Sequence, residues 1–189
     1  YITSNNILVE SELVQTNIGE DQIIPKYKSK YKLARDKYGY PAVKPPWGTL
    51  TALNLNNGKI IWQVPFGEFI NLTKKGISKT GTENIGGATA TSGNIVIATG
   101  TLDKKMYVFD SKDGKILYSK ELPFIGSAPP TTYQVNGEQY IIIHSTGGRV
   151  LKDTYPDIVE TGNILVAFKL KKWWCPRTDS NRGPIDYKS

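Results

Sequence analysis

The phrase ALNLNNGKIIW at residues 52–62 returns with the same pattern as VFDSKDGKILY at residues 108–118. In both copies a strand-like run leads into a polar turn that ends in glycine, Gly58 in the first and Gly114 in the second. The hydrophobic pair that opens the phrase comes a third time at residues 167–168. A repeat of 56 to 59 residues, written in short strands and glycine turns, predicts an all-β fold of the β-propeller type, built blade by blade.

Each full copy carries a large ring four residues after its turn glycine, Trp62 in the first and Tyr118 in the second. On the return strand of a hairpin, such a ring can lie flat against the neighbouring blade and bury about 150–250 Å². The glycine lets the turn pass through positive φ at little cost. We therefore assign these positions to packing between blades rather than to chemistry.

Four strand-like runs with tight turns between them make up the clearest blade. They cover residues 87–91, 94–99, 105–110 and 115–122. Runs of the same kind belong to the two neighbouring blades, at residues 48–55, 59–65, 130–135, 139–145 and 163–170. The apolar residues of the inner strands are expected in the core, among them Val96, Ile97 and 141–143. The sequence thus holds a partial β-propeller of two to three four-stranded antiparallel blades, too few to close a ring.

The chain divides into three regions by composition. Residues 1–47 hold a partial blade, with a strand-like run at Ile7–Val14, and then an extended Lys/Tyr/Pro-rich surface loop at residues 25–46. Residues 48–170 hold the propeller blades. Residues 171–189 have no strand periodicity and no place in the repeat, so we expect a tail outside the propeller, disordered or non-native.

The net charge of +7 is unevenly distributed over the 189 residues. Residues 26–44 carry a net charge of +6 and residues 171–189 a net charge of +3, which leaves −2 for the remainder. The predicted blades are therefore not basic, and the overall charge is not a nucleic-acid footprint. The alternating lysines and tyrosines of residues 26–44 could contact phosphates and stack on bases. A solvated loop is the simpler interpretation, and we predict no nucleic-acid partner.

Cysteine and histidine each occur only once, and this excludes several kinds of site. Cys175 is the only cysteine, so neither a disulfide nor a cysteine zinc site can form within the sequence. His144 is the only histidine, which excludes a histidine-rich metal site, and its apolar strand predicts a packed core residue. No apolar run is long enough to span a bilayer. The sequence begins at Tyr1 rather than at Met, so we expect a fragment or a processed chain.

Four segments carry a family resemblance when they are taken in order. They are KPPWGTLTALNLNNGKIIWQVP at 44–65, GGATATSGNIVIATGTLDKKMYVFD at 86–110, PFIGSAPPTTYQVNGEQYIIIHSTGG at 123–148 and GNILVAFKL at 162–170. Over about residues 38–170 the sequence resembles the C-terminal portion of the pyrroloquinoline quinone (PQQ)-dependent, or quinoprotein, dehydrogenases. Membrane glucose dehydrogenase and the related quinate and alcohol enzymes are the most similar in pattern.

The resemblance implies an eight-bladed propeller that holds PQQ on its axis beside a Ca²⁺ or Mg²⁺ ion. Such enzymes oxidise a sugar or alcohol hydroxyl and pass the electrons to a membrane quinone or a cytochrome. The catalytic Asp and most metal ligands of the family come from earlier blades, so no catalytic or metal-binding residue is expected here. By itself the fragment is expected to be inactive. The resemblance also implies a periplasmic location, with an anchor in the inner membrane through an N-terminal region outside this sequence.

The resemblance marks six candidate cofactor-binding residues: Asp103, Trp47, Thr101, Gly147, Gly148 and Arg149. Asp103 follows Gly-Thr-Leu at a strand end, where the loop points toward a propeller axis, and it matches a family Asp close to the cofactor. The alternative is a turn carboxylate that accepts local N–H groups. Trp47, in a proline-stiffened loop, would cover the quinone plane or line the entrance, and packing between blades is the alternative.

The pair Gly147-Gly148 would allow a ligand to approach the backbone closely. Family members often carry His directly after this pair, whereas this sequence has Arg149, so the role of that histidine does not carry over. Because PQQ carries three carboxylates, Arg149 could pair with one of them. A solvated arginine is the alternative.

A non-catalytic propeller of the same repeat type, acting as a protein-binding scaffold, is the competing function. Such scaffolds carry the repeat but lack the combination of PPWGTL and GTLD at residues 45–50 and 100–103. The sequence therefore favours the dehydrogenase.

Overall fold

The structure is a computed structural model that describes residues 1–15 and 26–169. The tail predicted at 171–189 therefore lies outside the described residues. The described parts form strands and two short helices, which follow one another as β1 (Ile2–Asn5), β2 (Val9–Gln15), β3 (Tyr27–Leu33), β4 (Gly48–Leu53), β5 (Ile60–Pro65), α1 (Ile70–Thr73), β6 (Asn84–Ala90), β7 (Ile95–Thr101), β8 (Lys105–Asp110), β9 (Ile116–Glu121), β10 (Thr131–Val135), β11 (Glu138–Ser145), α2 (Arg149–Thr154) and β12 (Ile164–Lys169). None of these helices is long and apolar enough to cross a membrane.

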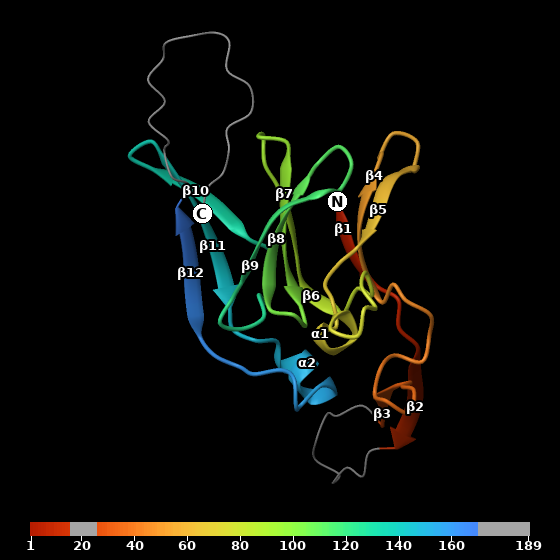
Figure 1. The fold of residues 1–189 in the computed structure, drawn as a ribbon. Helices are drawn as coiled ribbons and strands as arrows, with labels where there is room; N and C mark the ends of the chain where they lie inside the picture. The colour runs from red at the N-terminus through yellow and green to blue at the C-terminus, as the bar shows by residue number, and fades with distance from the viewer. Residues whose placement is uncertain (16–25, 170–189) are drawn as a thin grey trace.

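Three antiparallel sheets stand next to one another like sectors of a wheel (Figure 1). The first has the strand order β1-β4-β5, the second β6-β7-β8-β9 and the third β10-β11-β12. The repeated phrase forms the β4–β5 hairpin in the first sheet and the β8–β9 hairpin in the second. Its third beginning, at residues 167–168, lies in β12. The sheets are therefore successive blades, and the predicted all-β partial propeller is confirmed.

The second sheet is covered on both faces, because its strands alternate apolar residues toward the two neighbouring sheets. Val96 and Ala98 of β7 pack with Leu50 of the first sheet. Ile97, between them in sequence, packs on the opposite face with Ile143 of the third sheet. All five side chains are fully buried. This period-2 pattern explains why the middle blade is a continuous apolar layer, as the sequence predicts for Val96 and Ile97.

Trp62 joins the first blade to the second. Its Nε1–H donates a hydrogen bond of 3.0 Å to the carbonyl oxygen of Ser111, in the turn between β8 and β9. A Cβ added to Gly114 of that turn would lie 2.7 Å from Cε3 of the Trp62 ring. The prediction that Trp62 lies against the neighbouring blade is thereby confirmed. Its counterpart Tyr118 is 51% exposed, and the turn that corresponds to it in the third blade would follow β12, outside the described residues.

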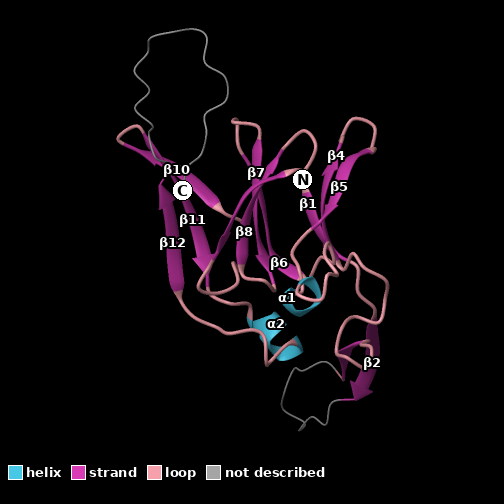
Figure 2. Ribbon diagram, in the orientation of Figure 1, coloured by secondary structure: helices cyan, strands magenta, loops and turns pink. Residues whose placement is uncertain are grey.

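The long connections gather at one end of the sheets, whereas tight hairpin turns lie at the other end (Figure 2). Both helices and the ribbon formed by β2 and β3 lie at the end with the long connections. In corresponding positions of the three blades, residues 6–47 join β1 to β4, residues 102–104 join β7 to β8, and residues 146–163 join β11 to β12. The long connections between strands therefore lie at one end of the blades.

The prediction of an extended loop over residues 25–46 is wrong for its first part. Residues Tyr27–Leu33 form β3, which pairs antiparallel with β2 and places Lys30 opposite Glu12 and Lys32 opposite Glu10. Opposite charges across a strand pair stabilise it, and strands with both faces exposed do not need an apolar alternation. The strand-like run predicted near Ile7–Val14 is found as β2.

The prediction that His144 is a core residue is also wrong. The neighbouring Ile143 and Ser145 are buried, but His144 is exposed, because successive residues of β11 point to opposite faces of the third sheet. Only the face of Ile143 is packed against the second sheet. His144 lies on the other face.

Candidate functional site

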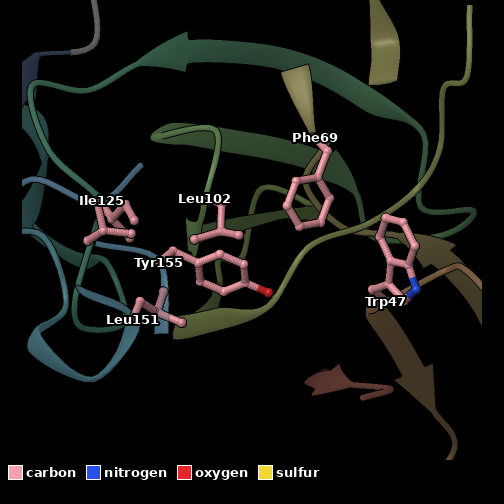
Figure 3. Packing of buried hydrophobic residues seen from close by; sticks show 7 residues of the cluster. Trp47, Phe69, Leu102, Ile125, Leu151 and Tyr155 are labelled. Carbon is pink, nitrogen blue, oxygen red and sulfur yellow. The ribbon is translucent and has the colours of Figure 1, made fainter. Parts of the chain in front are cut away.

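A buried layer of side chains joins the long connections at one end of the blades, and we call it the loop layer. Its buried members come from five different connections and are Trp47, Phe69, Leu102, Ile125, Leu151, Tyr155 and Val159. Figure 3 draws these side chains from close by and labels six of them. Because each connection belongs to a different part of the chain, the layer forms only when the three blades stand side by side.

Asp103 lies in the short turn between β7 and β8 and is 2% exposed. Its carboxylate accepts a hydrogen bond of 2.6 Å from the Thr101 hydroxyl and one of 3.0 Å from the backbone N–H of Glu68. The hydroxyl of Tyr107 donates a further, short hydrogen bond to it. The carboxylate thereby ties the connection between β5 and β6 to the second blade. These contacts agree with the alternative reading of Asp103 as a turn carboxylate.

Burial has the largest effect on the pKa of the Asp103 carboxyl. Burial raises the pKa of the Asp103 carboxyl above its ordinary value, while the hydrogen bonds from Thr101 and Tyr107 hold the rise down. Burial, and then the charge of Asp103, raises the pKa of the Tyr107 phenol well above its ordinary value. Tyr107 therefore stays protonated as a donor to Asp103.

Trp47 is 6% exposed within the loop layer. Its ring is stacked on Tyr40 at a centroid distance of 6.0 Å and meets Phe69 edge-on at 5.2 Å. Its Nε1–H donates a 2.7 Å hydrogen bond to the carbonyl oxygen of Val43. Aromatic contacts of this geometry stabilise a core beyond the area that they bury. Trp47 thus fixes the connection between β1 and β4 to the one between β5 and β6.

The glycine pair lets the chain itself approach closely. Gly147 has φ +84°, and a Cβ there would lie 2.0 Å from the carbonyl oxygen of Glu160. A Cβ on Gly148 would lie 1.9 Å from Cδ1 of Ile85, a residue that packs on the loop layer. Arg149 follows as the first residue of α2 and is exposed.

The predicted cofactor residues therefore lie in one region but differ in their surroundings. Trp47 belongs to the loop layer, Asp103 adjoins it through Leu102, and Gly148 borders it through Ile85. Thr101 is buried as the partner of Asp103. Arg149 does not enter the layer, and its guanidinium makes no ion pair with the described residues.

A pocket that no pattern in the sequence indicated opens beside the loop layer. Its volume is about 520 Å³. It is lined by aromatic, aliphatic and polar residues from four connections, namely Arg35, Tyr38, Gly39, Tyr40, Glu68, Phe69, Ile70, Asn71, Leu102, Thr154, Tyr155, Pro156, Asp157 and Ile158. Apart from Leu102, which lies in the GTLD segment, these residues belong to no motif in the sequence.

Arg35 shapes one wall of this pocket. Its guanidinium lies over the Tyr155 ring, 4.2 Å from the centroid, and donates hydrogen bonds of 2.6 Å to the carbonyl oxygens of Gly39 and Thr154. These contacts join the connection between β1 and β4 to the segment after α2. This wall is therefore built from side-chain and backbone groups that contact one another across two connections.

Comparison with known proteins agrees with this arrangement. Residues 6–141 match the PQQ family described as glucose/ethanol/alcohol dehydrogenase, beta-propeller domain. The quinate/shikimate dehydrogenase (quinone) of Acinetobacter baylyi is 30% identical over 172 residues, which cover 85% of this chain and 20% of that protein. The quinoprotein glucose dehydrogenase A of Acinetobacter calcoaceticus is 32% identical over 136 residues, covering 70% of this chain and 16% of that protein.

The chain thus spans about a fifth of the length of these curated relatives. Among solved structures, a europium-containing methanol dehydrogenase superposes with a TM-score of 0.64 over 89% of this chain and 30% of its own, at 17% identity. This likeness supports the propeller fold alone. Since the family match covers most of the sequence and the blades carry its repeat, the chain belongs to the β-propeller family of PQQ-dependent glucose/ethanol/alcohol dehydrogenases.

Proposed function

We propose that this chain forms part of the cofactor-bearing end of a quinoprotein dehydrogenase that oxidises a hydroxyl group of a sugar or an alcohol. The observation that carries the proposal is the convergence of Trp47, Asp103 and Gly148 on one end of three successive blades. Loops from adjacent blades meet at such an end, which is where propellers build their sites.

The residues of this end suit one edge of PQQ, a planar quinone with three carboxylates. When bound, PQQ supplies the capacity to accept two electrons from the substrate. The glycine pair at residues 147–148 packs closely against Glu160 and Ile85 and so holds the start of α2 in place. The exposed guanidinium of Arg149, next to it, can bind a carboxylate in bidentate fashion. Asp103 and Trp47 act as positioning residues that hold the connections in place.

The metal ion and the proton-accepting carboxylate belong, in this proposal, to other blades. The described residues contain no cluster of three or more His, Cys, Asp or Glu side chains that could hold a metal ion. We therefore assign the ligands of a Ca²⁺ or Mg²⁺ ion to a longer protein that includes this sequence. Alone, the 189-residue chain should bind PQQ weakly and should not turn over substrate.

A quinone or a cytochrome is the proposed electron acceptor, and the periplasm the proposed location, with an anchor in the inner membrane. The quinone acceptor is supported by the relationship to the Acinetobacter baylyi enzyme, whose name specifies a quinone.

The test uses the full-length gene product that includes this sequence, purified without PQQ. PQQ is titrated in the presence of Ca²⁺ or Mg²⁺, and dye reduction is then followed with glucose, quinate and simple alcohols. Wild-type protein should bind PQQ and reduce the dye with at least one substrate. Arg149→Ala should weaken PQQ binding about tenfold or more, since a charge-assisted pair is lost, whereas Lys152→Ala, exposed on the same helix, should not.

Two results would contradict the proposal. Absence of PQQ binding by the folded protein would favour a scaffold propeller. Equal PQQ affinity of the Arg149→Ala and Lys152→Ala variants would remove Arg149 from the cofactor site.

A further inference from the structure

A second cavity, of about 540 Å³, lies between the first and the second blade, and we call it the inter-blade groove. Its walls include Val64 and Pro65 of β5 on one side and Tyr107 of β8 and Ile116 of β9 on the other. Because β5 is the last strand of the first sheet and β9 the last strand of the second, the groove lies where both sheets end. It shares only Glu68 with the pocket beside the loop layer.

Three lysines line the inter-blade groove, Lys79, Lys105 and Lys115, against a single carboxylate, that of Glu68. None of the three ammonium groups makes an ion pair in the part of the chain that the structure describes. Lys105 is half-buried and lies opposite Glu121 across the pair of strands β8 and β9, so its charge is partly offset. Lys79 and Lys115 are exposed. They are therefore the two cations that an incoming ligand would meet.

The carboxylates close to these lysines in the chain have other partners. Asp110 and Asp113 flank the turn before Lys115, and they accept backbone N–H groups of that turn at 2.8 and 2.9 Å. The Glu68 carboxylate accepts a hydrogen bond of 3.3 Å from the hydroxyl of Thr73. These acidic groups are engaged locally, so the positive charge of the groove is available to a partner.

Lys79 and Lys115 stand at opposite ends of the groove. Lys115 adjoins Asp110, the last residue of β8, whose N–H donates a 2.8 Å hydrogen bond to its carbonyl oxygen. Lys79 belongs to the connection between β5 and β6, at the end of the blades where β8 begins. The first and last residues of β8 are about 16 Å apart, because a strand rises about 3.3 Å per residue.

This separation favours an extended ligand. A compact anion would have to draw both lysine side chains toward one point, which costs side-chain entropy. A chain of about five extended residues instead spans the distance between the two ends. The outer edges of β5 and β9 have no strand partner among the described residues, so a peptide backbone can form hydrogen bonds there.

The lining also distinguishes a peptide from a nucleic acid. Tyr107 is the only aromatic residue among the described residues that line the groove. It is buried, and its hydroxyl donates to Asp103. The groove thus offers no free ring on which bases would stack.

We propose that the inter-blade groove binds an extended acidic segment of a partner protein, with Lys79 and Lys115 each facing one of its carboxylates. Complementary charge at the two ends fixes the segment, and the terminal strands supply backbone hydrogen bonds between them. This interaction goes beyond the proposed function and does not depend on PQQ.

The experiment measures the fluorescence anisotropy of a labelled octapeptide of alternating glutamate and threonine at low ionic strength. The protein is the full-length gene product that includes this sequence, purified without PQQ. The same octapeptide with glutamine in place of glutamate is the neutral probe. Lys115→Glu and Lys79→Glu alter the groove. Lys112→Glu and Lys75→Glu are the matched controls, because both lysines are exposed in the same two connections but do not line it.

The acidic octapeptide should bind the wild-type protein, and its affinity should fall as salt is added. Lys115→Glu and Lys79→Glu should each weaken binding about fivefold or more, because an attraction becomes a repulsion. The two control variants should stay within about twofold of the wild type, since their charges are screened from the groove. The neutral octapeptide should not bind measurably. Thermal unfolding verifies that each variant is folded.

Wild-type affinity of both groove variants would overturn the inference. Equal losses in the groove variants and their controls would also overturn it, because overall charge would then explain the binding. Displacement of the octapeptide by an equal concentration of citrate would assign the groove to compact anions instead. Tighter binding of a thymidine decanucleotide, lost in the same variants, would assign it to nucleic acid. Failure of PQQ binding would leave all of these results unchanged, since the cofactor takes no part in the measurement.

Discussion

Single residues hold the connections of this chain together, and Asp103 is the most constrained of them. Its carboxylate accepts hydrogen bonds from Thr101, from Tyr107 and from the backbone of Glu68, a residue 35 positions earlier. Such a group stabilises the fold at the point where the predicted cofactor site begins. Its place in a turn agrees with the sequence, but its partners are set by the stacking of the blades.

Replacing Asp103 by alanine should destabilise the protein by about 3 kcal/mol. The substitution leaves the hydroxyls of Thr101 and Tyr107 and the N–H of Glu68 without an acceptor in a buried site. Urea unfolding of the two proteins measures the difference in free energy of unfolding. Asp113→Ala is the control, because Asp113 is an exposed turn carboxylate that accepts only the local N–H of Lys115. Equal losses for the two variants would contradict the role given to Asp103.

At the scale of elements, the contact between the Trp62 ring and the β8–β9 turn positions the first blade against the second. Trp62 of β5 lies against the β8–β9 turn at Gly114, and its indole N–H donates to the turn. The corresponding turn of the first hairpin, at Gly58, has open space around it. The two glycines thus share a local conformation but differ in their tertiary surroundings.

Gly114→Ala should therefore be more destabilising than Gly58→Ala. Both glycines have positive φ, +73° and +68°, so either alanine costs about 1 kcal/mol in backbone strain. The alanine at position 114 also meets the Trp62 ring, which adds about 1 to 3 kcal/mol. Unfolding of both variants in wild-type and Trp62→Ala backgrounds measures the coupling. The difference should disappear without the ring, and its persistence would contradict the proposed contact.

At the scale of the whole molecule, the outer blades each have one face without a neighbouring sheet among the described residues. On the third sheet this face includes His144 and Leu165, which pair across β11 and β12 and are both exposed. A closed propeller would cover such a face with its next blade.

In the full-length gene product that includes this sequence, Leu165→Asp should lower the free energy of unfolding by about 2 kcal/mol or more. The reason is that a charge would replace an apolar contact between blades. In the 189-residue chain alone, where Leu165 is 62% exposed, the effect should be small. Leu55, 92% exposed in the β4–β5 turn, provides the control substitution Leu55→Asp, which should be tolerated in both chains. Thermal unfolding compares them, and a Leu165→Asp variant as stable as the control would argue against a covering blade.

Local patterns in the sequence were sufficient to predict the strands and the blades that they form. Alternation with period 2 and the turn glycines predicted the strands of the middle sheet, the repeat predicted the neighbouring blades, and four ordered segments indicated the family. These features depend on interactions between residues close together in the chain or on the repetition of a whole unit. The lysine-rich residues of β3 were nevertheless predicted as a loop. They form a strand because they pair with β2, and a local pattern does not show that pairing.

Only the tertiary structure decided which faces are covered and which distant groups meet. The apolar run of β11 did not reveal that His144 faces outward, since that depends on which side the second sheet occupies. No pattern joined Arg35 to Tyr155, or Asp103 to the backbone of Glu68. These contacts arise between connections of different blades, whose relative positions are set by the packing of whole sheets rather than by any local run of residues.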